Sequence, residues 1–276
     1  MAVETSRDPG AFSAFERAGW NARICRYDTA FGAISRHTVE PMLEAAGIGP
    51  GMQVMDLCCG PGMLSAGALK RGASTVGVDF SEAAITLASI LVTEGRFRHG
   101  DAQALALPDA CFDAAVCGYG LMHLPDPTAG LREVLRVLRP GGRAAFSVWD
   151  AAGVGFTLVY EAVRARGSMN LPLPHGPDFF QLGSPERMCA ALDEVGFVAT
   201  SAYSLHQEWA VANADRYIDA ILGGTVRAAA VLKAQSAEAL ADIRDYIEES
   251  LRRLPGAGSN TLVPMPAVIG SGQRPI

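Results

Sequence analysis

The sequence lacks several features that mark particular classes of protein. Lysine and arginine form no run or stripe, and 29 acidic residues against 23 basic ones leave a formal net charge of −6. Duplex nucleic acid and anionic membranes bind clustered positive charge, so we expect neither as a partner. No stretch reaches the roughly 18 consecutive apolar residues of a membrane-spanning helix, and the first ten residues have no signal-peptide core. We therefore expect a soluble, cytoplasmic protein.

No pair of cysteines has the spacing of a zinc site or of a redox motif. The chain contains Cys25, Cys58, Cys59, Cys111, Cys117 and Cys189, without a C-x-x-C pair. We expect reduced, mostly buried thiols and no metal site. Only 19% of the residues are charged whereas 49% are hydrophobic, so the 276 residues carry enough apolar material for a full core and do not have the composition of a disordered chain.

What is present is an alternation of strand-like and helix-like segments. Short apolar runs typical of strands occupy residues 54–58, 75–79, 96–100, 112–118 and 143–149. Apolar residues at helical spacing lie between several of them, at 64–71, 81–93 and 127–138. Parallel strands need helix-length crossovers, and such crossovers are right-handed. The sequence therefore predicts a doubly wound α/β sheet with helices on both faces.

The segments outside this regular core predict the remaining organisation. A strand over 197–211 and a Pro-containing edge strand over 262–269 bring the predicted sheet to seven strands. The residues before the last strand have a helical pattern with one apolar face. We expect four parts: an N-terminal helical cap over 1–47, a core over 48–211 with an insertion at 151–183, a helical lid over 212–255, and a terminal edge strand with its tail over 256–276.

A glycine-rich loop after the first predicted strand is the most informative segment. Gly60 and Gly62 stand where that strand ends and a helix begins, so the backbone can pass close beneath a ligand. Asp79 ends the second strand 17 residues after Gly62, where a carboxylate can accept hydrogen bonds from ribose hydroxyls. The pair predicts a nucleoside-containing cofactor. The alternatives are a plain strand-to-helix turn and an Asp79 that caps the next helix.

Two details of the loop separate the candidate cofactors. A dinucleotide fingerprint needs a third glycine three residues after Gly62, and Ser65 stands there. An NAD-dependent oxidoreductase is therefore disfavoured. Asp56 precedes the loop, where its charge would repel a pyrophosphate but suits the ammonium group of an amino-acid moiety, directly or through water.

With these residues the sequence resembles the class I S-adenosylmethionine-dependent methyltransferases, and especially their ubiquinone and menaquinone biosynthesis C-methyltransferase branch. The resemblance covers about residues 37–150 and rests on four motifs: V-M-D-L-C-C-G-P-G (54–62), G-V-D-F-S (77–81), G-D-A-Q-A-L-A-L-P-D (100–109) with C-F-D-A-A-V (111–116), and L-R-P-G-G-R (138–143). It implies a Rossmann-like seven-stranded fold, S-adenosylmethionine as cofactor and in-line methyl transfer to a small-molecule acceptor. It leaves open whether oxygen, nitrogen or carbon is methylated.

The resemblance also implies roles for individual residues. Asp56, Gly60 and Gly62 would surround the methionine part of the cofactor, and Asp79 would hold the ribose. The remaining contacts would come from Phe80 against the adenine, Asp101 and the backbone N–H of Ala102 toward its polar edge, and Gly118 beside the transferring methyl group.

Residues for the acceptor side are fewer. A base is needed only where the acceptor must lose a proton, and the candidate is His123, just beyond the fourth strand. Its alternative is a structural or cofactor-side role. Tyr27 and Trp20 lie in the cap, where the resemblance suggests aromatic residues that close over the cofactor and the acceptor, and we expect Tyr27 to contact the cofactor; ordinary packing is the alternative. A non-catalytic S-adenosylmethionine-binding protein stays open as a second function, and the oligomeric state is also left open.

Overall fold

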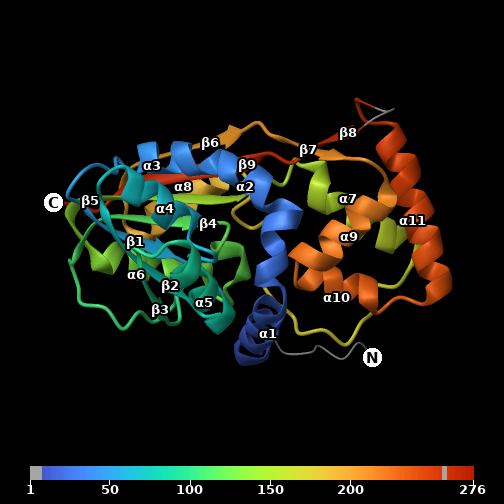
Figure 1. Ribbon diagram of the computed structural model, residues 1–276, viewed down its shortest axis with the longest axis horizontal. Helices are drawn as coiled ribbons and strands as arrows, with labels where there is room; N and C mark the ends of the chain where they lie inside the picture. The colour runs from blue at the N-terminus through green and yellow to red at the C-terminus, as the bar shows by residue number, and fades with distance from the viewer. Residues whose placement is uncertain (1–7, 257–259) are drawn as a thin grey trace.

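The structure is a computed structural model that describes residues 8–256 and 260–276, and it has two lobes (Figure 1). One lobe is a seven-stranded sheet with helices on its faces, and the other is mainly helical. The N-terminal helix α1 (Pro9–Tyr27) lies between them. Across the sheet the strands follow the order β3 (Arg96–His99), β2 (Ser74–Asp79), β1 (Gln53–Leu57), β4 (Phe112–Gly118), β5 (Leu138–Trp149), β9 (Ala267–Gln273) and β6 (Val198–Leu205).

The pairing of these strands confirms the predicted doubly wound α/β fold. The five strands from β3 to β5 are parallel, and β9 runs antiparallel to both β5 and β6. The order reverses between β1 and β4, because β2 lies on one side of β1 and β4 on the other. The carboxyl ends of β1 and β4 therefore form the crevice in which open α/β sheets bind ligands.

Helices cover both faces of the sheet as predicted. One face carries α3 (Val39–Ala45) and α4 (Met63–Lys70), whose Leu43 and Leu64 pack over Val54 and Val116. The other carries α6 (Pro127–Val137) and α8 (Pro185–Val195). Both begin with a capping side chain followed by proline, the arrangement that satisfies free N–H groups at a helix start. At the β3 edge, α5 (Glu82–Leu91) is capped by Ser81.

The predicted terminal edge strand is wrong. β9 lies inside the sheet between β5 and β6, and residues 267–272 are all buried. The prolines that suggested an edge, Pro264 and Pro266, precede β9, so every residue of β9 keeps a backbone N–H for its ladder. The sheet edge is instead β6, whose residues are mostly exposed or half-buried.

The segment expected as one strand over 197–211 also divides. β6 ends at Leu205, and β7 (Glu208–Val211) pairs with β8 (Thr261–Pro264) in a separate two-stranded sheet beside the helical lobe. Gln207 stands between the two strands and is buried. Its side-chain amide donates to the Tyr119 hydroxyl at 3.1 Å. The residue between β6 and β7 is therefore hydrogen-bonded to the residue that follows β4.

The helical lobe is built from both insertions of the core. It contains α7 (Val154–Arg166), α9 (Ala214–Gly224), α10 (Arg227–Lys233) and α11 (Ala237–Arg252). Tyr217 is fully buried, and its hydroxyl donates to the carbonyl of Gly155 at 2.6 Å. Ile243 and Ile247 of α11 belong to the same continuous core cluster as Phe146 of the sheet. The apolar faces predicted for 213–254 are thus buried against the body of the protein.

The N-terminal region connects the lobes. After α1 the chain continues through the π-helical turn Asp28–Gly32, α2 (Ala33–Ser35) and a 3₁₀ turn at Arg36–Thr38 into α3. The first seven residues of the expected cap, and residues 257–259 of the expected tail, lie outside the described residues.

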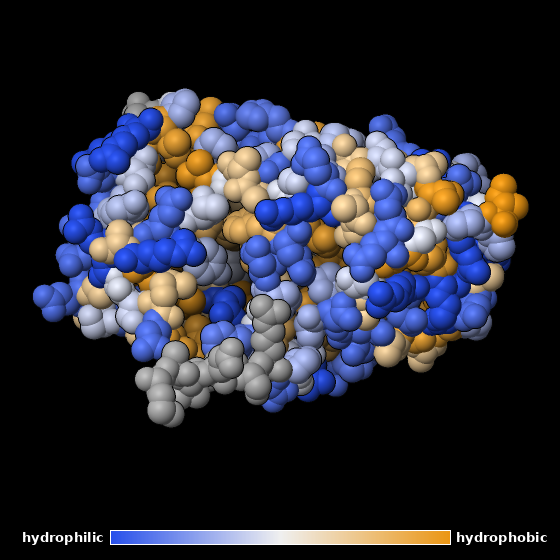
Figure 2. All heavy atoms as spheres, turned by 180° about the vertical axis from the view of Figure 1, so that it is seen from behind, coloured by the Kyte–Doolittle hydropathy of each residue, from blue (hydrophilic) through white to orange (hydrophobic). Residues whose placement is uncertain are grey.

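On the face shown in Figure 2, hydrophilic residues predominate and hydrophobic ones are mostly recessed between them. Within the described ranges, no helix combines the length and apolar character needed to cross a membrane.

Candidate functional site

A deep cleft opens at the carboxyl ends of β1, β2 and β4, between the sheet, α1 and the helical lobe. Counted up to its open mouth, and with the solvent space there included, it encloses about 1620 Å³. Nine of the ten predicted site residues line it: Tyr27, Asp56, Gly60, Asp79, Phe80, Asp101, Ala102, Gly118 and His123. Gly62 does not line the cleft but begins α4.

The backbone of the glycine loop adopts left-handed conformations. Gly60 has φ +51° and Gly62 has φ +84°. A Cβ atom on Gly60 would meet only Ile24, at 3.9 Å, whereas one on Gly62 would lie 3.0 Å from Val92. Gly60 thus leaves the loop open at this point. At position 62 glycine is needed for two reasons: the left-handed backbone conformation and the close neighbouring side chains. Cys58, a non-glycine residue with φ +53°, begins this strained turn.

The Asp79 carboxylate holds the glycine loop from the end of β2. It is buried, and its oxygens accept hydrogen bonds from the N–H of Gly60 at 3.0 Å and of Ser81 at 2.8 Å. Burial raises the pKa of Asp79, while these two hydrogen bonds oppose that rise. Each carboxylate oxygen accepts more than one hydrogen bond, so both keep capacity for ligand hydroxyls.

Asp56 lines the cleft near the end of β1, and one of its two carboxylate oxygens is hydrogen-bonded. The Oδ2 atom accepts from the backbone N–H and the hydroxyl of Ser65, at 2.9 and 2.7 Å. The Oδ1 atom is buried without a hydrogen-bond partner among the described residues. Burial raises the pKa of Asp56 to about 7. An unpaired buried carboxylate oxygen is costly unless a donor arrives, and the ammonium of an amino-acid moiety supplies one.

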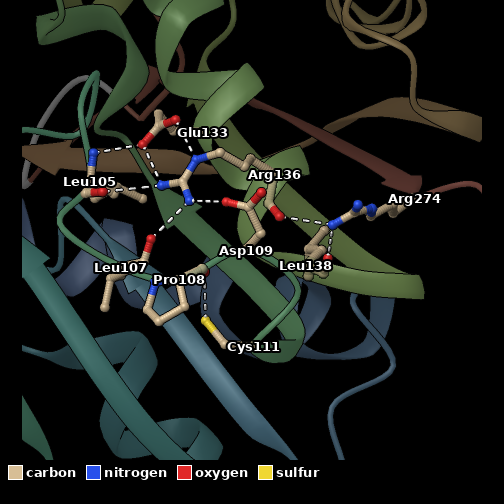
Figure 3. Close-up of polar contacts among 9 residues, drawn as sticks. All are labelled: Leu105, Leu107, Pro108, Asp109, Cys111, Glu133, Arg136, Leu138 and Arg274. Atoms are coloured by element: carbon tan, nitrogen blue, oxygen red, sulfur yellow. Dashed lines mark hydrogen bonds and ion pairs between the residues drawn. The ribbon is translucent and has the colours of Figure 1, made fainter.

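Asp101 and Ala102 begin the connection between β3 and β4, and the later residues of this connection are held by α6 (Figure 3). Arg136 of α6 pairs with Glu133 at 2.8 Å and with Asp109 at 2.6 Å, and its guanidinium also donates to the carbonyls of Leu105 and Leu107. Arg274 in turn donates to the carbonyls of Arg136 and Leu138. These contacts fix the connection between β3 and β4, and so the two residues at its start.

The far side of the cleft is an aromatic wall made by elements distant in sequence. Tyr119, at the end of β4, stacks on Trp149, at the end of β5, with ring centroids 4.2 Å apart. The wall continues through Phe156 of α7, 5.2 Å from Trp149, to Phe179, 5.7 Å further on. Tyr119 has φ +55°, an unusual conformation for a bulky residue. Phe179 and the segment 118–123, which contains Tyr119, were predicted near the ligands, whereas Trp149 and Phe156 were missed, although Trp149 follows the rule that ligands bind at strand carboxyl ends.

His123 lies where the two sides of the cleft meet. It ends a short 3₁₀ helix at Leu121–His123, and its ring packs edge-on against Trp20 at 5.0 Å. Its Nδ1 atom lies 3.0 Å from Oε2 of Glu16, a carboxylate of α1 that is only 2% exposed. Glu16 was not predicted, since 107 residues separate the pair and no local pattern marks a polar residue on the inner face of α1.

Two further polar residues line the cleft, Tyr27 and Arg227. Tyr27 lines the cleft, bonded to Ser35 through hydroxyl oxygens 2.7 Å apart, and burial raises the pKa of Tyr27 to about 12. Arg227 at the start of α10 donates to the carbonyl of Pro174 at 2.6 Å. In the described part of the chain, no group of three His, Cys, Asp or Glu side chains is placed to hold a metal ion.

Comparisons with known proteins agree with this geometry. A family profile described as a methyltransferase domain matches residues 55–146. The ubiquinone biosynthesis O-methyltransferase of Pseudomonas fluorescens is 31% identical over 162 residues, which cover 56% of this chain and 68% of that protein. An uncharacterized protein of Mycobacterium tuberculosis is 28% identical over 179 residues, or 63% of this chain, and the match spans 65% of that relative's length.

Solved structures share the fold at low sequence identity. The Haemonchus contortus phosphoethanolamine N-methyltransferase 2, solved with phosphomonomethylethanolamine and S-adenosylhomocysteine, superposes with a TM-score of 0.58 at 15% identity. The superposition covers 96% of this chain and 60% of that one. At this identity the likeness concerns the fold alone.

Proposed function

Because the chain belongs to the class I S-adenosylmethionine-dependent methyltransferases, we propose that it methylates a small, largely apolar, ring-bearing acceptor in this cleft. The observation that carries the proposal is that the strand-end motifs and the aromatic wall line one continuous space. One side offers carboxylates and an open loop, and the other offers ring surfaces. A charged nucleoside and an apolar partner would therefore meet at the ends of β1 and β4.

The residues of the first side fit S-adenosylmethionine. The orphaned Oδ1 of Asp56 suits its ammonium group, and Asp79 keeps acceptor capacity for ribose hydroxyls. Phe80 would flank the adenine, with Asp101 and Ala102 at its polar edge, and Gly118 would border the reacting atoms. When bound, the cofactor supplies an electrophilic methyl group on its sulfonium sulfur.

The chain's own contribution to the reaction would be alignment and the exclusion of water. Methyl transfer is an in-line displacement, and holding two reactants in the reactive geometry lowers the barrier by several kcal/mol, up to about 10. Trp149, Phe156 and Phe179 would hold a flat acceptor against the cofactor side. His123 would accept a proton where the acceptor must lose one.

The acceptor is proposed to be a small molecule rather than nucleic acid. Arg227 is the one lysine or arginine among the described residues that line the cleft, whereas phosphate backbones are bound by several. The name of the Pseudomonas relative, a ubiquinone biosynthesis enzyme, supports a ring-bearing acceptor.

We also propose that the helical lobe acts as a lid that sets acceptor choice. Residues 224–228, where α9 ends and α10 begins, line the cleft. The lobe also completes the hydrophobic core, so its removal as a whole would unfold the protein. Point changes at its cleft surface are the suitable test.

The decisive experiment is to incubate the purified protein with methyl-labelled S-adenosylmethionine and a metabolite extract, and to identify labelled products by mass spectrometry. We expect a labelled small molecule whose yield, at a limiting concentration of S-adenosylmethionine, falls strongly with an Asp79→Ala variant. Tight binding of the cofactor without any labelled product would refute catalysis and leave a binding protein.

A further inference from the structure

We propose that Glu16 is a positioning residue that fixes the ring of His123, so that Nε2 faces the cleft as a proton acceptor for the methyl acceptor. The inference rests on the proposed methyl transfer and narrows it. It predicts an acceptor whose methylated atom carries a proton, such as a hydroxyl oxygen or an acidic carbon. A neutral tertiary amine, which needs no base, would not require this pair.

The contact geometry supports an orienting role. Glu16 Oε2 lies 3.0 Å from Nδ1 of His123, so a carboxylate there accepts the Nδ1 proton and leaves the Nε2 lone pair free. Trp20 at 5.0 Å and Phe179 at 6.0 Å both meet the imidazole edge-on. The ring is therefore held by apolar neighbours, and Nδ1 has its proton acceptor inside the protein.

The position of Glu16 is itself fixed by contacts of α1. Asn21, about one turn and a half further along α1, accepts from the Ser81 hydroxyl at 2.7 Å at the start of α5. Gly19 lies so close to Val226 of the helical lobe that a Cβ atom there would stand 2.2 Å from Cγ1. The helix is thus held on both sides. Burying the Glu16 carboxylate carries a desolvation penalty. The proposed role, holding His123 in one tautomer, accounts for a carboxylate at this buried position.

The proton balance follows from this arrangement. The acceptor's proton moves to Nε2, and the electron pair it leaves behind forms the bond to the methyl carbon as the carbon–sulfur bond breaks. The imidazolium carries the proton beside the Glu16 carboxylate, which stabilises it, until the proton passes to solvent at the cleft mouth.

The test compares Glu16→Met, which keeps the side-chain length without an oxygen, with Glu16→Gln, which keeps an oxygen acceptor without charge. The first readout is independent of turnover: ¹⁵N NMR of His123 with S-adenosylhomocysteine bound. We expect the Nδ1–H tautomer in the wild type and in Glu16→Gln, and a shift toward Nε2–H in Glu16→Met. Arg17→Met is the matched control, because it removes a charge from an exposed position of α1 next to Glu16 and should leave the tautomer unchanged.

The second readout is kinetic. For Glu16→Met we expect kcat to fall about tenfold or more. For Glu16→Gln we expect a kcat between those of Glu16→Met and the wild type. Both variants should bind S-adenosylhomocysteine with an affinity within about twofold of wild type. The double variant with His123→Ala should be no slower than His123→Ala alone, since Glu16 acts through His123.

Several results would overturn the proposal. These are an Nε2–H tautomer in the wild type, unchanged tautomer and kcat in Glu16→Met, or a loss of S-adenosylhomocysteine affinity that matches the loss of turnover. If the wild-type protein transfers no methyl group, the proposed function fails by itself. The tautomers then decide the positioning role: Nδ1–H in the wild type and in Glu16→Gln, but not in Glu16→Met, would support it, and any other pattern would reject it.

Discussion

The two sides of the cleft are built in different ways. On the cofactor side, Asp56, Gly60 and Asp79 come from two adjacent parallel strands and the loop between them, and the Gly60–Asp79 and Ser65–Asp56 hydrogen bonds span 19 and 9 positions. On the acceptor side, Glu16 meets His123 across 107 positions, and Tyr119 meets Gln207 across 88. The first side is specified by local motifs, and the second exists only after separate segments have come together. Variants should therefore affect the two sides independently.

The largest expected effect is on the acceptor side. His123→Ala should lower kcat by about 100-fold while the affinity for S-adenosylmethionine stays nearly constant, because the ring would serve proton removal rather than cofactor binding. Single-turnover kinetics and calorimetry measure the two quantities separately. If the affinity for S-adenosylmethionine falls in parallel with kcat, His123 belongs to the cofactor side, and the two sides do not function independently. An unchanged kcat would leave a structural role.

A change on the cofactor side should produce the reverse pattern. Asp79→Ala removes a charged acceptor and should weaken S-adenosylmethionine binding by about 1.5 to 3 kcal/mol, roughly 10- to 150-fold. Because Asp79 also accepts from Gly60 and Ser81, the unfolding temperature must be measured alongside calorimetry. Asp79→Asn is the control that keeps the shape. Normal affinity in a folded Asp79→Ala protein would remove Asp79 from the cofactor site.

A smaller effect is expected in the pH dependence of cofactor binding. With its pKa at about 7, Asp56 is protonated below that pH in the free protein, whereas an ammonium neighbour favours the carboxylate. Binding then releases a proton, so affinity should rise with pH between about 5.5 and 7, by less than about tenfold per unit. Calorimetry in buffers of different ionisation enthalpy detects that proton. Asp56→Asn should flatten the dependence, and an equal slope in the variant would assign it to Asp79 or another group.

The smallest effects distinguish the two glycines of the loop. Gly62→Ala combines a left-handed dihedral with contacts to Val92 and Phe97, and should lower the free energy of unfolding by about 2 kcal/mol. Gly60→Ala has the dihedral strain but open space, so about 1 kcal/mol is expected. Denaturant unfolding gives both values. Equal losses would mean that the loop conformation alone matters, and that the neighbours of Gly62 adjust.

The sequence by itself determined the parallel core and the cofactor side of the cleft. Strand and helix periods are local, and glycine and aspartate act where strands end, so Gly60, Asp79 and Asp56 were placed correctly at the carboxyl edge without knowledge of distant contacts. Gly62 is the exception. Its left-handed conformation allows the turn into α4, and it packs near Val92 and Phe97 instead of lining the cleft.

Only the tertiary structure decided the rest. The place of β9 inside the sheet depends on pairing that sets Ala267 between Trp149 of β5 and Leu205 of β6, which no local signal encodes. The pairing of Glu16 with His123 likewise depends on how α1 packs, because a side chain's partner is set by three-dimensional proximity. Single residues of the acceptor side, such as His123, could be predicted from the sequence, but their pairings with Glu16 and Gln207 could not, because those contacts are long-range.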